Sequence, residues 1–194
     1  MIQWQAPRAT AKISRAPGRE RGGEAVATLT ALTFHSLTGA DQALVIVEQL
    51  QRDGALHVLD AATIRWPRRS RKPDPHVQAR TGQAQLDASF WRLLTGIIFL
   101  APRFEATGGG SGAVTGSLAD IGIDEIFIRD VRTHAVPNTS ALFLLTNGAV
   151  TDRGIEALDG LNPSVIATNL PASKESRLFE IFAVRTAPQR SPAD

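Results

Sequence analysis

Three carboxylates follow a glycine-rich stretch of the sequence: Asp120, Asp124 and Glu125. Carboxylate oxygens are ligands that a hard cation such as Mg²⁺ prefers, so this cluster could bind one. The same residue types also fit the start of a helix, where an aspartate caps free backbone N–H groups and a glutamate lies near the positive end of the helix dipole. We therefore expect Asp124 to be an N-cap, Gly122 to be the left-handed residue that ends the preceding helix, and no metal to bind.

Other residue types that perform catalysis lack partners at a useful spacing. The chain has 194 residues, no cysteine, no G-x-S-x-G motif and four histidines, none of them in an H-x-x-x-H pair. Disulfides and thiolate chemistry are thereby excluded. His35 and His57 fall on strands that we expect to be neighbours, where they could form a packing pair. The sequence predicts a protein that is not an enzyme, with no catalytic residue and no cofactor.

Residues 106–128, ATGGGSGAVTGSLADIGIDEIFI, are the most distinctive segment. A phosphate-binding loop needs a lysine after its last glycine, whereas Gly116 is followed by Ser-Leu. A G-x-G-x-x-A match to the dinucleotide fingerprint begins at Gly108, but the preceding PRFEAT is not an apolar strand. A membrane span is a further alternative, although residues 90–101 give only twelve residues where about 20 are needed.

The spacing of the glycines favours a close-packed helical hairpin instead. Gly108, Gly112 and Gly116 recur every fourth residue, so they share one ridge of a helix, and the absence of side chains lets a second backbone approach. Gly96 and Ala101 on the preceding apolar helix could receive that ridge. Each glycine costs about 1 kcal/mol against alanine in a free helix, so tight packing must offset it. The sequence predicts that the partner of this ridge is the apolar helix 86–102 of the same chain or the same hairpin of another copy.

Positive charge is concentrated in two segments. Residues 1–27 carry five basic and two acidic side chains, and residues 65–80 carry six basic and one acidic. Such a loop could clamp phosphates, with a tryptophan stacking on a base, or contact anionic lipid headgroups. The alternative is a solvated loop beyond a strand. The candidate residues for an anionic partner are Arg65, Trp66, Arg68, Arg69, Arg71 and Lys72.

The pattern of apolar residues predicts strands alternating with helices. Capping residues and glycines mark the helix ends, with Thr38 or Asp41 starting the first helix and Gly54 ending it. Three prolines in nine residues indicate a loop after the second strand, with a short hairpin as an option. The expected strands are 27–37, 57–66, 140–147 and 164–170. The expected helices are 38–54, 86–102, a glycine-rich one ending at 122, 124–136, 151–162 and 171–184.

This order is two β-α-β units with a helical insert between them. It predicts an α+β fold, a ferredoxin-like sheet with helices on one face and a glycine-rich helical hairpin inserted. We expect a flexible basic arm at 1–27, a single domain at 28–184 with the insert at about 86–136, and a tail at 185–194. Sheet edges at 57–66 or 164–170 could also pair with a partner's edge.

Three segments resemble a bacterial family of unknown function, numbered twelve sixty-nine, whose members are often labelled membrane proteins. They are FWRLLTGIIFLAP, the glycine stretch running into the D-x-G-I-D-E-x-F-I segment, and SALFLLTN. The resemblance covers roughly residues 31–183 and implies no known activity. Arg103 and Glu105 depart from the family's run of small apolar residues, which argues against a continuous membrane hairpin.

Together these features predict a non-catalytic structural or regulatory module that assembles with itself through the glycine-rich hairpin and sheet edges. The alternative function is binding to an anionic surface through the loop 65–72 and the basic arm. A membrane periphery is favoured over a nucleic acid as that surface. We expect a cytoplasmic location, with membrane association left open.

Overall fold

The computed structural model describes residues 27–70, 74–76, 86–99 and 118–183. Their strands are β1 (Ala27–Phe34), β2 (Val58–Trp66), β3 (Asp74–His76), β4 (Thr139–Asn147) and β5 (Ser164–Leu170). Their helices are α1 (Gly39–Arg52), α2 (Ala88–Phe99), α5 (Glu125–His134), α6 (Asp152–Leu158) and α7 (Ala172–Phe182), with a 3-10 turn η1 (Asp159–Leu161).

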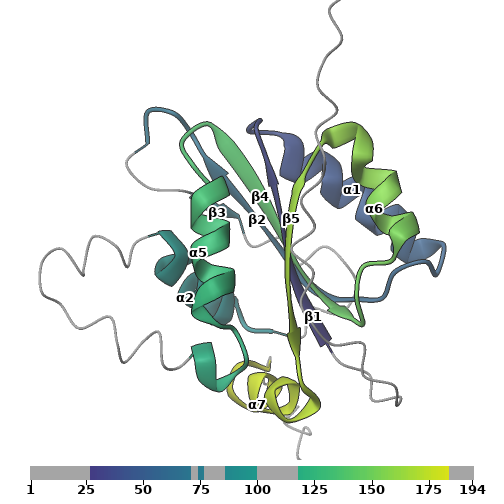
Figure 1. The fold of residues 1–194 in the computed structure, drawn as a ribbon, viewed down its shortest axis with the longest axis vertical. Helices are drawn as coiled ribbons and strands as arrows, with labels where there is room; N and C mark the ends of the chain where they lie inside the picture. The colour runs from purple at the N-terminus through teal and green to yellow at the C-terminus, as the bar shows by residue number, and fades with distance from the viewer. Residues whose placement is uncertain (1–26, 71–73, 77–85, 100–117, 184–194) are drawn as a thin grey trace, which may run out of the picture.

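The strands form one sheet in the order β3-β2-β4-β1-β5 (Figure 1). Every neighbouring pair is antiparallel. In each unit, β1-α1-β2 and β4-α6-β5, the chain crosses over one intervening strand, which is the ferredoxin-like arrangement that the sequence predicts. The fold is α+β as expected, and β3 confirms the short hairpin after β2.

The two faces of the sheet have separate apolar cores. Alternate residues of a strand point to opposite faces, so Leu32 and Phe34 of β1 pack with α1, whereas Leu29 and Ala31 belong to the core that includes α2 and α5. Leu178 of α7 joins this second core. The expectation of helices on one face is therefore wrong. Helices α2, α5 and α7 cover the face that the two crossover helices, α1 and α6, leave bare (Figure 1).

A close approach between β1 and α1 explains where β1 ends. A Cβ at Gly39 would lie 2.5 Å from Phe34 Cβ, so only glycine fits there. Ser140 secures the same turn, because its Oγ accepts from Ala40 N at 3.0 Å and donates to Ser36 O at 2.7 Å. The strand stops at Phe34, three residues earlier than predicted, because the chain must already turn into α1.

Parallel strands set apart the two histidines that were expected to pair. β1 and β2 both run antiparallel to β4, which lies between them, so they point the same way. His35 follows the end of β1, and His57 precedes the start of β2. The two residues lie at opposite ends of the sheet, and both are exposed. The predicted packing pair is wrong.

Candidate functional site

The two edges of the sheet differ in how well they are protected. Unpaired backbone groups on an edge strand invite another strand, and proteins usually block them with short strands, prolines, charges or bulges. The β3 edge is three residues long, and its middle residue, Pro75, has no N–H to donate. In the part of β2 that β3 does not cover, the register of β2 with β4 is broken between Val58 and Asp60. This edge carries several of the usual blocking devices.

The β5 edge carries none of them. Its seven residues, SVIATNL, contain no charge and no proline, and their register with β1 is unbroken from Ser164 to Leu170. β1 covers one side of β5, and no strand of the described residues pairs with the other side. Pro163 and Pro171 bracket the strand. A regular, uncharged edge of this length has the backbone geometry to accept one more strand.

The side chains of β5 also leave room beside the strand. Ile166 and Leu170 are buried in the core shared with α2 and α5. Ala167 and Asn169 point to the other face and are exposed. Thr28 Oγ1 donates to Asn169 Oδ1 at 3.2 Å, so even this polar side chain leans back over β1 rather than across the free edge. No bulky or charged side chain of β5 blocks an incoming strand.

Anchors at both ends hold β5 in place. Asn162, with φ 48°, is the left-handed residue after η1, where asparagine is among the better tolerated side chains. After β5, the Lys174 ammonium of α7 donates to Asp120 O at 2.8 Å, and Ala27 N donates to Glu175 Oε2 at 3.3 Å. The strand is thereby fixed at both ends in a conformation suited to pairing.

The glycine-rich hairpin predicted for self-association lies mostly outside the described residues. Gly108, Gly112 and Gly116 are not described. Gly96 lies on α2, and apart from its chain neighbours and the backbone of its own helix no described atom lies within 4 Å of the position where its Cβ would be. In the described residues α5 packs against α2, and Phe182 of α7 also meets Phe90 of α2 edge to face. The close packing of glycine ridges stays a prediction.

The structure does show how the chain is held on either side of that stretch. Arg132 of α5 donates to the last carbonyls of α2, through Nε to Ile98 O at 2.7 Å and through Nη2 to Ile97 O at 2.6 Å. Arg132 thereby ties α5 to the last described turn of α2. The guanidinium also opposes the negative end of the helix dipole.

On the far side of the stretch, residues 118–123 form a Schellman turn. Ile123 N donates to Leu118 O at 2.9 Å and Gly122 N donates to Ala119 O at 3.0 Å, with Gly122 at φ 87°. Asp124 then accepts from Phe127 N at 2.8 Å as the N-cap of α5. The predicted roles of Gly122 and Asp124 are confirmed. No cluster of potential metal ligands occurs among the residues that the structure describes.

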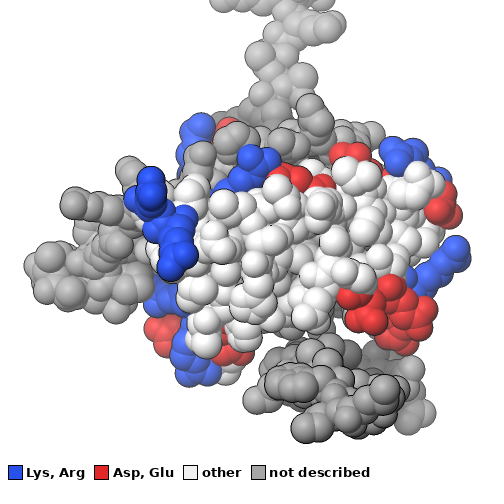
Figure 2. All heavy atoms as spheres, turned by 90° about the horizontal axis from the view of Figure 1, so that it is seen from above, with Lys and Arg blue, Asp and Glu red and all other residues white. Residues whose placement is uncertain are grey.

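The basic loop is only partly available to a partner. Arg65 of β2 pairs with Asp41 of α1 at 2.6 Å, so Asp41 binds β2 rather than capping its own helix. Arg68 and Arg69 are exposed. Arg71 and Lys72 lie outside the described residues. Figure 2 shows the side of the molecule seen from above, where basic side chains lie in small groups near the margin, some beside acidic ones, around an uncharged middle.

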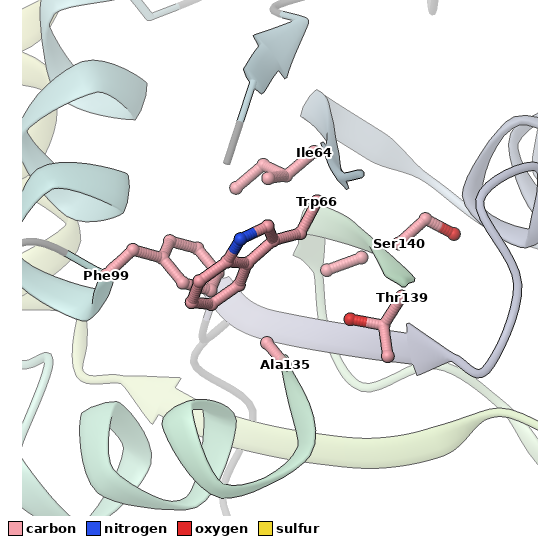
Figure 3. Close-up of a pocket in the computed structure, with 7 residues that line it drawn as sticks. Ile64, Trp66, Phe99, Ala135, Thr139 and Ser140 are labelled. Atoms are coloured by element: carbon pink, nitrogen blue, oxygen red, sulfur yellow. The ribbon is translucent and has the colours of Figure 1, made fainter. Parts of the chain in front are cut away.

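Trp66 is packed into the fold. Its indole N–H donates to Ser70 O at 3.2 Å, and its ring meets Phe99 of α2 edge to face at 5.6 Å between centroids. Figure 3 shows this ring directed towards Phe99 beside a small hollow that Ala135 and Thr139 also line. The hollow is too tight to hold a water molecule, whereas small-molecule sites typically enclose about 300–1,000 Å³.

A buried acid links β2 to the start of the insert. Asp60 is 2% exposed, and its carboxylate accepts from Ala61 N at 2.7 Å and from Leu86 N at 2.9 Å. Burial raises the pKa of Asp60, while these two hydrogen bonds and the nearby Trp91 indole lower it. The Trp91 N–H is itself buried and makes no hydrogen bond of ordinary geometry within the described residues. An aspartate inside the apolar strand VLDAATIRW was the available sequence signal, and it was missed.

Comparison with known proteins assigns the family. The family model described as Protein of unknown function (DUF1269) matches residues 86–183. This chain belongs to that family. The match begins at Leu86, so the first part of the span expected from the resemblance, residues 31–85, lies outside it. No curated protein and no solved structure matches the chain. In the described residues, no helix is both long and apolar enough to span a lipid bilayer.

Proposed function

We propose that this DUF1269 protein is a non-catalytic module that assembles with itself through the outer edge of β5. The observation that carries the proposal is the contrast between the two sheet edges. The β3 edge is short and interrupted by a proline, whereas β5 offers seven regular, uncharged residues. Natural proteins seldom leave such an edge free, and another copy of the same uncharged strand meets no like charge across it.

The strength of such an association can be bounded. A ladder along β5 offers roughly one backbone hydrogen bond per residue, and each contributes about 0.5–1.5 kcal/mol net. Association costs about 4 kcal/mol or more in lost translational and rotational freedom. The free energy that remains is at most about 6 kcal/mol, which corresponds to dissociation constants on the order of tens of micromolar or weaker. We therefore expect a reversible, concentration-dependent oligomer.

Light scattering over a dilution series tests the proposal. The parent chain should gain mass with concentration, and Ala167→Lys should shift the transition to higher concentration because two lysines would then approach across the edge. Ala157→Lys is the matched control, since Ala157 is exposed on α6, outside β5, and the charge added is the same. A parent chain that stays monomeric to about 1 millimolar would refute the proposal.

The glycine ridge is a second contact that the sequence predicts for the same assembly. Gly112→Leu would place a side chain where two backbones are expected to meet, so we expect weaker assembly and a lower melting temperature. Normal assembly and melting of this variant would remove the ridge from the proposal and leave the β5 edge untouched.

Binding to an anionic surface has less support as a function. Arg65 is paired with Asp41, and Trp66 packs on Phe99, so neither is free to contact a phosphate or a base. Of the candidate residues that the structure describes, Arg68 and Arg69 are the exposed ones.

A further inference from the structure

We infer that the assembly is a closed dimer in which β5 pairs antiparallel with β5 of a second copy, with Ala167 opposite Ala167 on the two-fold axis. This inference rests on the proposed function and specifies its partner and register. It is argued from the length of β5, from the faces of its side chains and from the state of the opposite edge.

The faces of β5 limit the register. A two-fold axis perpendicular to the sheet brings the same face of both copies to the same side. Residues directly opposite each other must point to the same face, and faces alternate along a strand. A residue must therefore pair with a residue whose number differs from its own by zero or by an even number. The axis then lies midway between the two copies of one residue. An axis at Ala167, the middle of Ser164–Leu170, pairs all seven residues. An axis at Ile166 or Thr168 pairs only five, because Pro163 and Pro171 flank the strand.

This register is also chemically compatible. It places Val165 opposite Asn169 and Ile166 opposite Thr168 of the second copy, with no charge on either strand. The small exposed side chain of Ala167 meets only itself. Since both copies keep the same face on the same side, their α1 and α6 layers lie together on one side of a continuous sheet.

The opposite edge explains why pairing stops at two copies. Pairing of identical edges is isologous and closes after one contact, whereas growth needs a second open edge on each copy. In the described residues that second edge is β3, with Pro75 at its centre, followed by the irregular register near Asp60. As far as the structure describes the chain, the dimer therefore presents these blocked edges to solution.

Single cysteines test the register, because the chain has none of its own. Paired residues have Cα atoms about 4.5–5.5 Å apart, within reach of a disulfide. Ala167→Cys should therefore cross-link to itself under mild oxidation. Asn169→Cys should not, because two copies of residue 169 would lie about 13 Å apart along the strands. A mixture of Val165→Cys and Asn169→Cys should cross-link as a heterodimer.

The control is Ala157→Cys, which is exposed on α6 and should stay uncross-linked. Cross-links are read on non-reducing gels, and mass is read in parallel by light scattering on the cysteine-free chain. At least tenfold more cross-linking for Ala167→Cys than for Asn169→Cys or Ala157→Cys, with mass reaching a plateau at two copies, supports the inference.

Other outcomes separate this inference from the proposed function. Equal cross-linking at residues 167 and 169, or mass growth beyond two copies, overturns the register or the closure while self-assembly stands. A monomeric cysteine-free chain overturns both. A charge swap gives an independent check: Ala167→Lys mixed with Ala167→Glu should dimerise at least as well as the parent, because the axis sets the two charges opposite each other.

Discussion

Replacing Asp60 with alanine removes the acceptor of two buried N–H groups at once. In the native fold these are Ala61 N and Leu86 N, at 2.7 and 2.9 Å from the carboxylate. A buried donor left without an acceptor costs about 1–3 kcal/mol, so the two together predict a loss of about 2–6 kcal/mol in the free energy of unfolding. That loss is a large fraction of the about 5–15 kcal/mol typical of a domain.

Urea denaturation followed by tryptophan fluorescence measures this loss, since Trp91 lies beside Asp60 and is fully buried. Glu156→Ala, on the exposed surface of α6, is the control and should change the free energy of unfolding by no more than about 0.5 kcal/mol. If Asp60→Ala costs less than about 1 kcal/mol, the carboxylate does not hold the start of the insert as described.

The pH dependence of stability provides a second test of the same residue. The pKa of Asp60 is raised above its ordinary value of 3.8 by burial. Its contribution to stability is therefore fully present below that value and is lost as the pH rises through the folded-state pKa. The free energy of unfolding of the parent, minus that of Asp60→Asn, should fall as the pH rises from 3.8 towards neutrality. A difference that stays flat or rises would contradict the assignment.

Three further substitutions test the anchors and the basic loop. Arg132→Ala should lower the free energy of unfolding by about 1–3 kcal/mol. Arg132→Lys should have an intermediate effect, because lysine lacks the planar guanidinium that reaches two carbonyls. Equal effects of the two substitutions in urea denaturation would argue against this role of Arg132. Gly122→Ala should lower the free energy of unfolding by about 1 kcal/mol or more, because φ 87° strains a residue with a side chain and a Cβ would lie 3.1 Å from Leu170. An unchanged melting temperature would rule out that strain. Arg68→Ala with Arg69→Ala should leave stability within about 0.5 kcal/mol, and retention on anionic vesicles that survives this double change would exclude these residues as a lipid site.

Local signals in the sequence were enough to place most elements. Apolar residues bounded by Pro163 and Pro171 gave β5 its observed limits, and the D-x-G-I-D-E segment gave both the Gly122 turn and the Asp124 cap. These features depend on neighbours within a few residues along the chain. The prediction of a ferredoxin-like order held for the same reason, because two β-α-β units leave few ways to arrange a sheet.

Features that depend on distant residues were missed. An amphipathic pattern shows that a helix has a buried side, but not which face of the sheet it covers, so the second helical layer was not foreseen. The separation of His35 from His57 follows from the parallel course of β1 and β2, because the end of one strand and the start of the other then lie at opposite ends of the sheet. Asp60 was open to inference, since a carboxylate inside an apolar strand needs donors, yet its main donor is 26 positions away.

The family match and the sheet together define which part of the chain must fold as one. The matched residues 86–183 contain β4 and β5, but these strands are not neighbours, because β1 lies between them and makes all of the pairing seen for β5. Residues 86–183 alone would leave both edges of β5 unpaired and would expose Leu142 and Leu144, which pack with α1. The candidate self-association edge is an outer edge only because β1 occupies the inner one. The segment before the match is therefore part of the same folding unit, and we expect a fragment of residues 86–183 to lack the cooperative unfolding of the whole chain.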